Sequence, residues 1–222
     1  MRLSIHAGHA PAGGIGCGAV GFLDESECAR QIVAETMELL SNYGHVVTDV
    51  TVQCPMSANA VLKELVSRME CIDVDIHISV HLNASGDLSA HGYECYVWSK
   101  TGIAGEVGEK IGRNMENIGY RNRGVKEGRG LYVIRHTTAP CLLIECGFVT
   151  NRDDAALYDP KRIAAAIAHA VCAMSVDFPS NGDTVEGKYA VQIGMFKSRS
   201  NAEKFLENVR NSGFPDAYMK EV

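Results

Sequence analysis

The chain has 222 residues, of which 46% are hydrophobic and 22% are charged, and its formal net charge is −6 at pH 7. These values are ordinary for a soluble globular protein, and the length suits one full domain plus a small appendage. The acidic balance argues against a nucleic-acid partner, because phosphate backbones attract clustered cations. No apolar run is long enough to span a bilayer, and MRLSIHAGHA lacks an export pattern, so we expect cytoplasmic synthesis and no membrane contact.

The eight cysteines form no C-x-x-C pair, and several fall inside apolar runs such as PCLLIECGF. We interpret them mostly as buried thiols rather than as a disulfide framework or a zinc cluster. This use of cysteine favours a reducing compartment.

Segments with the period of a strand alternate with segments of helical period over residues 1–175. We predict strands at 2–8, 45–52, 74–85, 91–100, 130–137 and 140–148, and helices at 25–44, 57–72, 104–119 and 159–174. Such alternation predicts an α/β fold with a mostly parallel twisted sheet flanked by helices. Ligands of these sheets gather at the carboxyl ends of the strands, where His9, His81 and Glu145 are expected.

The C-terminal part of the sequence changes in character. Residues 176–188 are rich in turn formers and read as a linker. Residues 189–222 suggest strand, helix and strand, a small βαβ half-domain that is too short to bury a core alone. We expect it to pack on the main domain, to pair with another copy, or to be half of a longer unit.

Two histidines stand four residues apart in DIHISVHLNAS. On a strand, His77 and His81 share a face but lie roughly 13 Å apart, so one metal ion cannot bind both. His81 is near the carboxyl end of the strand and is the site candidate. His77 is interpreted as a core or sheet-face histidine.

A catalytic zinc site needs about three protein ligands and an open position for water. His9 lies in a glycine-flanked turn, HAGHAP, and Glu25 opens the first helix in FLDESECAR. Either residue alone also has a structural interpretation: a solvent-facing histidine, or a carboxylate that favours the helix N-terminus. Glu27 competes with Glu25 for any ligand role, and Asp24 is the better candidate for the helix cap.

Glu145 follows the apolar residues CLLI in a strand predicted to be buried. A carboxylate there costs several kcal/mol unless it is paired or near a cation. Such a position suggests a general base, and the alternative is a structural salt bridge to Arg135 or Arg129.

Four ordered segments together resemble the zinc-dependent N-acetylmuramoyl-L-alanine amidases over about residues 1–175: IHAGHA, GAVGFLDESECARQI, DIHISVHLNAS and RNRGVKEGRGLYVIRHTTAPCLLIECGFVTNRDDAALYDP. The resemblance implies one Zn²⁺ per chain bound by His9, Glu25 and His81, with Glu145 as the catalytic base. The implied reaction is hydrolysis of the amide bond between N-acetylmuramic acid and L-alanine in peptidoglycan.

Further polar residues are candidates for substrate contacts. Asn83 follows the His81 strand position, and RGVKEGRG places Arg123, Lys126 and Arg129 in what we predict to be a basic loop near the site. We hypothesise that these four side chains bind the substrate, the three cations through stem-peptide carboxylates. The alternative is a solvated basic loop.

The tail YAVQIGMFKSRSNAEKFLENVRNSGFPDAY is similar to one sporulation-related (SPOR) repeat, which implies binding to the cell wall. Tyr189, Gln192 and Phe196 would then contact the wall. A complete unit of that family has two such halves, so we hypothesise a homodimer in which two chains supply them. With no export signal recognised, the enzyme is expected to reach the wall by lysis-linked release, either as a phage lysin or when a mother cell dies.

Three rival functions remain to be weighed. A wall-binding protein that keeps the amidase fold without catalysis would not need Glu145 beside zinc ligands. A zinc peptidase usually carries a ligand pair such as H-E-x-x-H, which this sequence lacks. A cysteine hydrolase would use Cys141 or Cys146, but Cys146 should point to the face opposite Glu145.

Overall fold

The computed structural model describes residues 1–174, 198–211 and 218–219 of the chain. In this part, six strands form one sheet: β1 (Arg2–Ala7), β2 (Val46–Asp49), β3 (Ile76–Asn83), β4 (Tyr93–Val97), β5 (Asn122–Glu127) and β6 (Cys141–Phe148). The helices are α1 (Glu25–Asn42), α2 (Ala58–Glu70), α3 (Ile103–Asn117), α4 (Tyr132–Arg135), α5 (Arg152–Leu157), α6 (Pro160–Cys172) and α7 (Arg199–Asn211).

The strand order is β2-β1-β3-β6-β4-β5. All neighbouring pairs are parallel except β4 and β6, which are antiparallel. The predicted α/β class and mostly parallel sheet are therefore confirmed. Because β4 runs the other way, its first residues lie beside the carboxyl end of β6, and this decides which side chains meet there.

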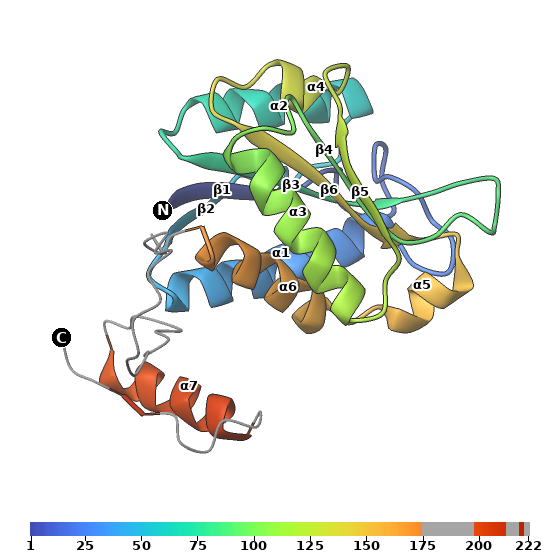
Figure 1. Ribbon diagram of the computed structural model, residues 1–222. Helices are drawn as coiled ribbons and strands as arrows, with labels where there is room; N and C mark the ends of the chain where they lie inside the picture. Colours follow the sequence, from blue (N-terminus) through green and yellow to red (C-terminus); the bar gives the residue numbers. More distant parts are fainter. Residues whose placement is uncertain (175–197, 212–217, 220–222) are drawn as a thin grey trace.

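Helices cover both faces of the sheet (Figure 1). One face packs against α1, α3 and α6, and it takes alternate residues of β3, including Ile76, Ile78 and Val80. The opposite face packs against α2 and α4, with Cys141 and Leu143 of β6 in its core. Both faces of the central strands are thus buried between helices, but on the face of α2 and α4 the strands β1 and β3 present polar residues, among them His6 and His77.

Two expectations for the chain between 120 and 137 were wrong. Residues 130–137 do not form a strand; they contain α4, whose Val133 and Ile134 are buried. The strand that completes the set of six is β5 (Asn122–Glu127), where the sequence suggested a basic loop. A short apolar run does not distinguish helix from strand, and an edge strand with one buried residue, Val125, shows no hydrophobic alternation.

The cysteine interpretation was right for half of the set. The buried thiols are Cys28, Cys95, Cys141 and Cys146; Cys17 and Cys172 are half-buried, and Cys54 and Cys71 are exposed. All eight cysteines are free in the structure. In the described ranges, none of the helices is both long enough and apolar enough to cross a membrane.

Within the C-terminal part, α7 is the helix predicted there. Its Phe205 ring makes an edge contact with Tyr43, the residue that follows α1, with ring centroids 5.9 Å apart. The two strands predicted on either side of α7, and the proposed wall contacts Tyr189, Gln192 and Phe196, lie outside the described residues. The boundaries proposed for the catalytic domain, the linker and the repeat stay predictions.

Candidate metal centre and catalytic carboxylate

His9, Glu25 and His81 converge at the carboxyl edge of the parallel strands. His9 lies two residues beyond β1, Glu25 is the first residue of α1, and His81 is near the end of β3. Oε1 of Glu25 is 2.9 Å from Nε2 of His9 and 3.1 Å from Nδ1 of His81, and the two ring nitrogens are 3.1 Å apart. Among the residues the structure describes, this is the cluster suited to hold a metal ion.

Two glycines make room for these side chains. A Cβ at Gly8 would lie 1.8 Å from Cε1 and Nε2 of the His81 ring. At Gly18, whose φ is +84°, a Cβ would lie 2.6 Å from Oε2 of Glu25 and 2.8 Å from Cδ2 of His9. Any other residue at either position would displace a member of the cluster.

The start of α1 fixes which glutamate enters the cluster. Asp24 caps the helix by accepting a hydrogen bond from the Glu27 backbone N–H, and Glu27 is exposed. Glu25 is buried, and its carboxylate accepts hydrogen bonds from the backbone N–H groups of Ala19 and Leu82. The structure therefore brings Glu25, and not Glu27, to His9 and His81.

The ionisation of the cluster suits a cation. Burial alone would raise the pKa of Glu25, but hydrogen bonds to His81 and His9 outweigh it and hold that pKa far below the usual range. Burial lowers the pKa of His81, partly offset by Glu25. At neutral pH the cluster thus offers an ionised carboxylate and a neutral His81 imidazole, the forms that bind metals.

Glu145 lies beside this cluster in the centre of the sheet. It is opposite His81 in the parallel β3–β6 register and opposite Glu94 in the antiparallel β6–β4 register. Side chains paired in this way project from the same face. Its Oε2 is buried without a hydrogen-bond partner among the described residues, so no salt bridge to Arg129 or Arg135 forms. Burial, together with the charges of Glu25 and Glu94, raises the pKa of Glu145 well above its ordinary value.

Glu94 is the buried acceptor that sequence reasoning missed. Its Oε1 accepts from Nδ2 of Asn83 at 2.9 Å, and its Oε2 from Nε of Arg123 and Nζ of Lys126 at 2.5 Å each. Burial acts to raise the pKa of Glu94, but Lys126 and Arg123 outweigh it and lower it to about 2. The available signal was a charged residue between the buried Tyr93 and Cys95, on the face of β4 that they do not occupy.

Three of the four proposed substrate contacts, Asn83, Arg123 and Lys126, therefore bind the Glu94 carboxylate. Glu94 is the β4 residue opposite Glu145, so the three side chains lie next to Glu145. The Arg123 guanidinium also lies over the Phe148 ring, 5.1 Å from its centroid. Arg129 does not join them. It follows β5 and donates from Nε to the carbonyl oxygen of Trp98, which follows β4. Arg129 therefore lies at the other end of the strands, away from the metal cluster. Its predicted place near the site was wrong, because the chain at 122–127 is a strand that runs away from the cluster.

The remaining histidines of this face lie deeper in the sheet. His77 is buried and its Nδ1 is 2.6 Å from Oγ of Ser4, which agrees with its interpretation as a core histidine. His6 is fully buried, and neither ring nitrogen has a partner among the described residues. Burial, with smaller contributions from His81 and His77, lowers the pKa of His6 to about 3, so it is neutral.

Residues 3–174 match a family model described as N-acetylmuramoyl-L-alanine amidase. The chain belongs to this family. It is therefore related to enzymes that cut peptidoglycan between N-acetylmuramic acid and L-alanine. Residues 185–222 match a second model, the SPOR domain.

Two relatives show how much of the chain is shared. An uncharacterized protein of Clostridium perfringens is 29% identical over 77% of this chain, which spans 51% of that relative. The sporulation-specific N-acetylmuramoyl-L-alanine amidase of Bacillus subtilis is 24% identical over 96% of this chain and 82% of its own. The chain thus spans about half the length of the first relative and about four fifths of the second.

A solved structure has the same fold as this chain. The catalytic domain of an endolysin targeting Clostridia difficile superposes with a TM-score of 0.71 at 23% identity. The match covers 78% of this chain and 97% of that domain. At this identity the comparison shows the fold alone, and the roles of individual residues rest on the geometry described above.

Proposed function

We propose that the chain is a zinc-dependent N-acetylmuramoyl-L-alanine amidase in which His9, Glu25 and His81 hold the metal and Glu145 is the general base. The observation that carries this proposal is the position of Glu145. Its Oε2 is buried and has no hydrogen-bond partner in the part of the chain that the structure describes, and the residue is paired with His81 across the β3–β6 ladder.

The donor set fits zinc. Ligand atoms about 2.1 Å from a tetrahedral Zn²⁺ are roughly 3.4 Å from one another, a few tenths of an ångström more than the separations seen here. The three nitrogen–oxygen and nitrogen–nitrogen distances in the cluster are 2.9, 3.1 and 3.1 Å. Two imidazoles and one carboxylate also form the ligand chemistry of catalytic zinc sites, which keep a fourth position for water or substrate. When bound there, Zn²⁺ would lower the pKa of a water ligand to about 7 and polarise the substrate carbonyl.

Glu145 performs the proton transfers in the proposed reaction. Its raised pKa makes it a stronger base than an exposed glutamate. It takes a proton from the attacking water as the carbon–oxygen bond forms, and it gives that proton to the leaving nitrogen as the carbon–nitrogen bond breaks. The products are a lactyl carboxylate on the muramic acid and a free amino group on L-alanine.

Asn83, Arg123 and Lys126 support recognition of the stem peptide in this proposal. Glu94 neutralises only one of the two cations, so the group keeps a net positive charge beside the carboxylate that performs the chemistry. Both cations are partly exposed, with 28% and 39% of the Arg123 and Lys126 side chains accessible. They are suited to bind a carboxylate of the stem peptide.

The experiment that tests the proposal measures new N-terminal alanine released from purified peptidoglycan. We expect activity in the wild type, loss after chelation, recovery with Zn²⁺, and loss in Glu145→Ala. Glu116→Ala, which removes an exposed carboxylate of α3, is the matched control and should retain activity. Retained wall binding without any new amino terminus would instead identify a non-catalytic binding protein with the amidase fold.

The route to the wall and the state of assembly are further parts of the proposal. The SPOR match supports a C-terminal contact with peptidoglycan, and we propose that the enzyme acts at the cell wall after lysis-linked release. The homodimer through two SPOR halves stays a prediction. A strictly monomeric elution of the full chain at micromolar concentration would contradict it.

A further inference from the structure

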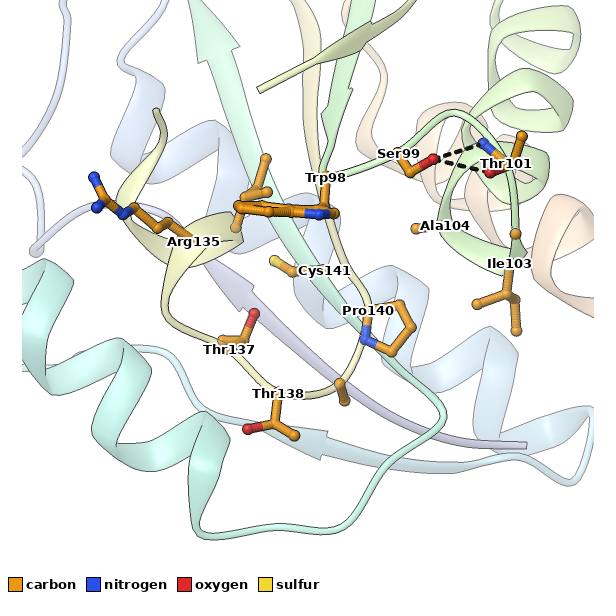
Figure 2. A pocket seen from close by; sticks show the side chains of 13 residues that line it. Trp98, Ser99, Thr101, Ile103, Ala104, Arg135, Thr137, Thr138, Pro140 and Cys141 are labelled. Atoms are coloured by element: carbon orange, nitrogen blue, oxygen red, sulfur yellow. Dashed lines mark hydrogen bonds between the residues drawn. The ribbon is translucent and has the colours of Figure 1, made fainter. Parts of the chain in front are cut away.

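A cavity of about 420 Å³ lies at the end of the strands opposite to the end that carries the metal cluster (Figure 2). It is bordered by the chain that follows β4, the first turn of α3 and the segment between α4 and β6. Its lining residues are Trp98, Ser99, Thr101, Gly102, Ile103, Ala104, Ile134, Arg135, Thr137, Thr138, Ala139, Pro140 and Cys141. The volume falls within the range of small-molecule sites, roughly 300 to 1,000 Å³.

Trp98 provides an exposed aromatic surface at this cavity. It is the single tryptophan of the sequence, and it is 51% exposed. Figure 2 shows its indole ring extending from the end of β4 above Cys141. Arg129 fixes this region, because its guanidinium lies 5.4 Å from the ring centroid while its Nε donates to the Trp98 carbonyl oxygen at 3.0 Å. A large aromatic side chain held in place at the surface is typical of a binding site rather than of a core.

Hydroxyl groups surround the indole. Oγ of Ser99 and Oγ1 of Thr101 are 2.9 Å apart on one side of the cavity, and Thr137 and Thr138 lie on the other (Figure 2). Glu70 holds the Thr138 side of the rim by accepting hydrogen bonds from the Thr138 backbone N–H and hydroxyl at 2.8 and 2.7 Å. The Thr137 and Thr138 hydroxyls already donate, to the Val133 carbonyl oxygen and to Glu70, so their oxygens can still accept from sugar hydroxyls and from acetamido N–H groups.

This combination of groups suits a carbohydrate. A pyranose ring presents C–H groups that pack on an indole face and hydroxyls at its rim that bond to serine and threonine. No carboxylate occurs among the lining residues that the structure describes, and Arg135 contributes a positive charge. A positively charged peptide is therefore a poorer fit than a neutral or acidic sugar.

We propose that this cavity binds an N-acetylated sugar of the glycan strand, remote from the bond that is cut. The inference rests on the proposed function in one respect: the substrate is a polymer whose sugars continue beyond the scissile amide. A second contact with the same polymer keeps the enzyme near its next bond and raises the effective concentration of substrate.

The single tryptophan makes the test direct, because its emission reports on this cavity and on no other part of the chain. The probe is the tetramer of N-acetylglucosamine, which contains no muramoyl amide, added to the full chain carrying Glu145→Ala. We expect a saturable change in Trp98 emission. Ala139→Phe, which fills the cavity and retains Trp98, should weaken that response at least tenfold.

Two further variants separate the cavity from the rest of the protein. Retention on peptide-free glycan strands should fall at least tenfold in Trp98→Ala and stay unchanged in Leu88→Ala, which removes an exposed apolar side chain from the loop after β3. No saturable emission change in the parent chain, or an unaltered response in Ala139→Phe, would overturn the inference. Sugar binding is measured without turnover, so a chain that binds the tetramer but never releases alanine would refute only the proposed function.

Discussion

Replacing Gly8 by alanine tests the metal centre without touching a ligand. The added Cβ would lie 1.8 Å from Cε1 and Nε2 of His81, whereas real Cβ contacts stay beyond 3.0 Å. The imidazole must therefore retreat by roughly 1.2 Å, and a misplacement of about 1 Å in a catalytic group costs on the order of 100-fold in rate. We expect zinc affinity to fall about 10- to 100-fold, the range found when the support of a metal ligand is lost.

The backbone at Gly8 does not lie in the left-handed region, so alanine is compatible with its conformation. The remaining cost is overpacking, about 1 to 3 kcal/mol in the free energy of unfolding of the metal-free protein. Zinc affinity is measured by competition with a chromophoric chelator, alongside circular dichroism and alanine release. Gly86→Ala is the matched control, because a Cβ there meets nothing within 4 Å. Wild-type zinc affinity and turnover in folded Gly8→Ala would refute the assignment of His81 as a ligand.

Four other predictions concern residues of β4 and β6. Glu145→Gln should lower kcat about 100- to 10,000-fold while zinc affinity, measured by the same competition, stays near wild type; retained kcat would exclude Glu145 as the base. Glu94→Ala should destabilise the fold by about 2 to 3 kcal/mol in urea unfolding, below the usual cost of breaking a buried pair because Arg123 and Lys126 can turn to solvent. The lowered Glu94 pKa means that its ion-pair stabilisation is complete above its ordinary pKa of 4.5 and is lost as pH falls toward 2. Glu94→Gln should therefore flatten the acid side of a plot of stability against pH, and an unchanged slope would contradict the ion-pair account. Cys146→Ala should keep turnover nearly intact, because Cys146 is buried on the face opposite Glu145, and a large loss would revive the cysteine-hydrolase alternative.

The sequence predicted the central strands well because their signal is local. A continuous apolar run specifies β6, alternating apolar residues specify β3, and the helical period specifies α1 and α6. The same reasoning failed for two neighbouring segments: it predicted a loop where β5 lies and a strand where α4 lies. A polar edge strand gains its hydrogen bonds from a neighbour far along the chain, and a four-residue apolar helix is defined by what it packs against.

The sequence by itself indicated His9, His81 and either Glu25 or Glu27 as candidate ligands and Glu145 as the candidate base, since motif order and strand ends are properties of the chain. Tertiary structure alone decided that Glu25 enters the cluster instead of Glu27, through the Asp24 cap. It also placed Glu94 beside Glu145, because β4 runs antiparallel to β6. The direction of a strand is fixed by its pairing with distant parts of the chain. The five residues that form β4 do not contain that information.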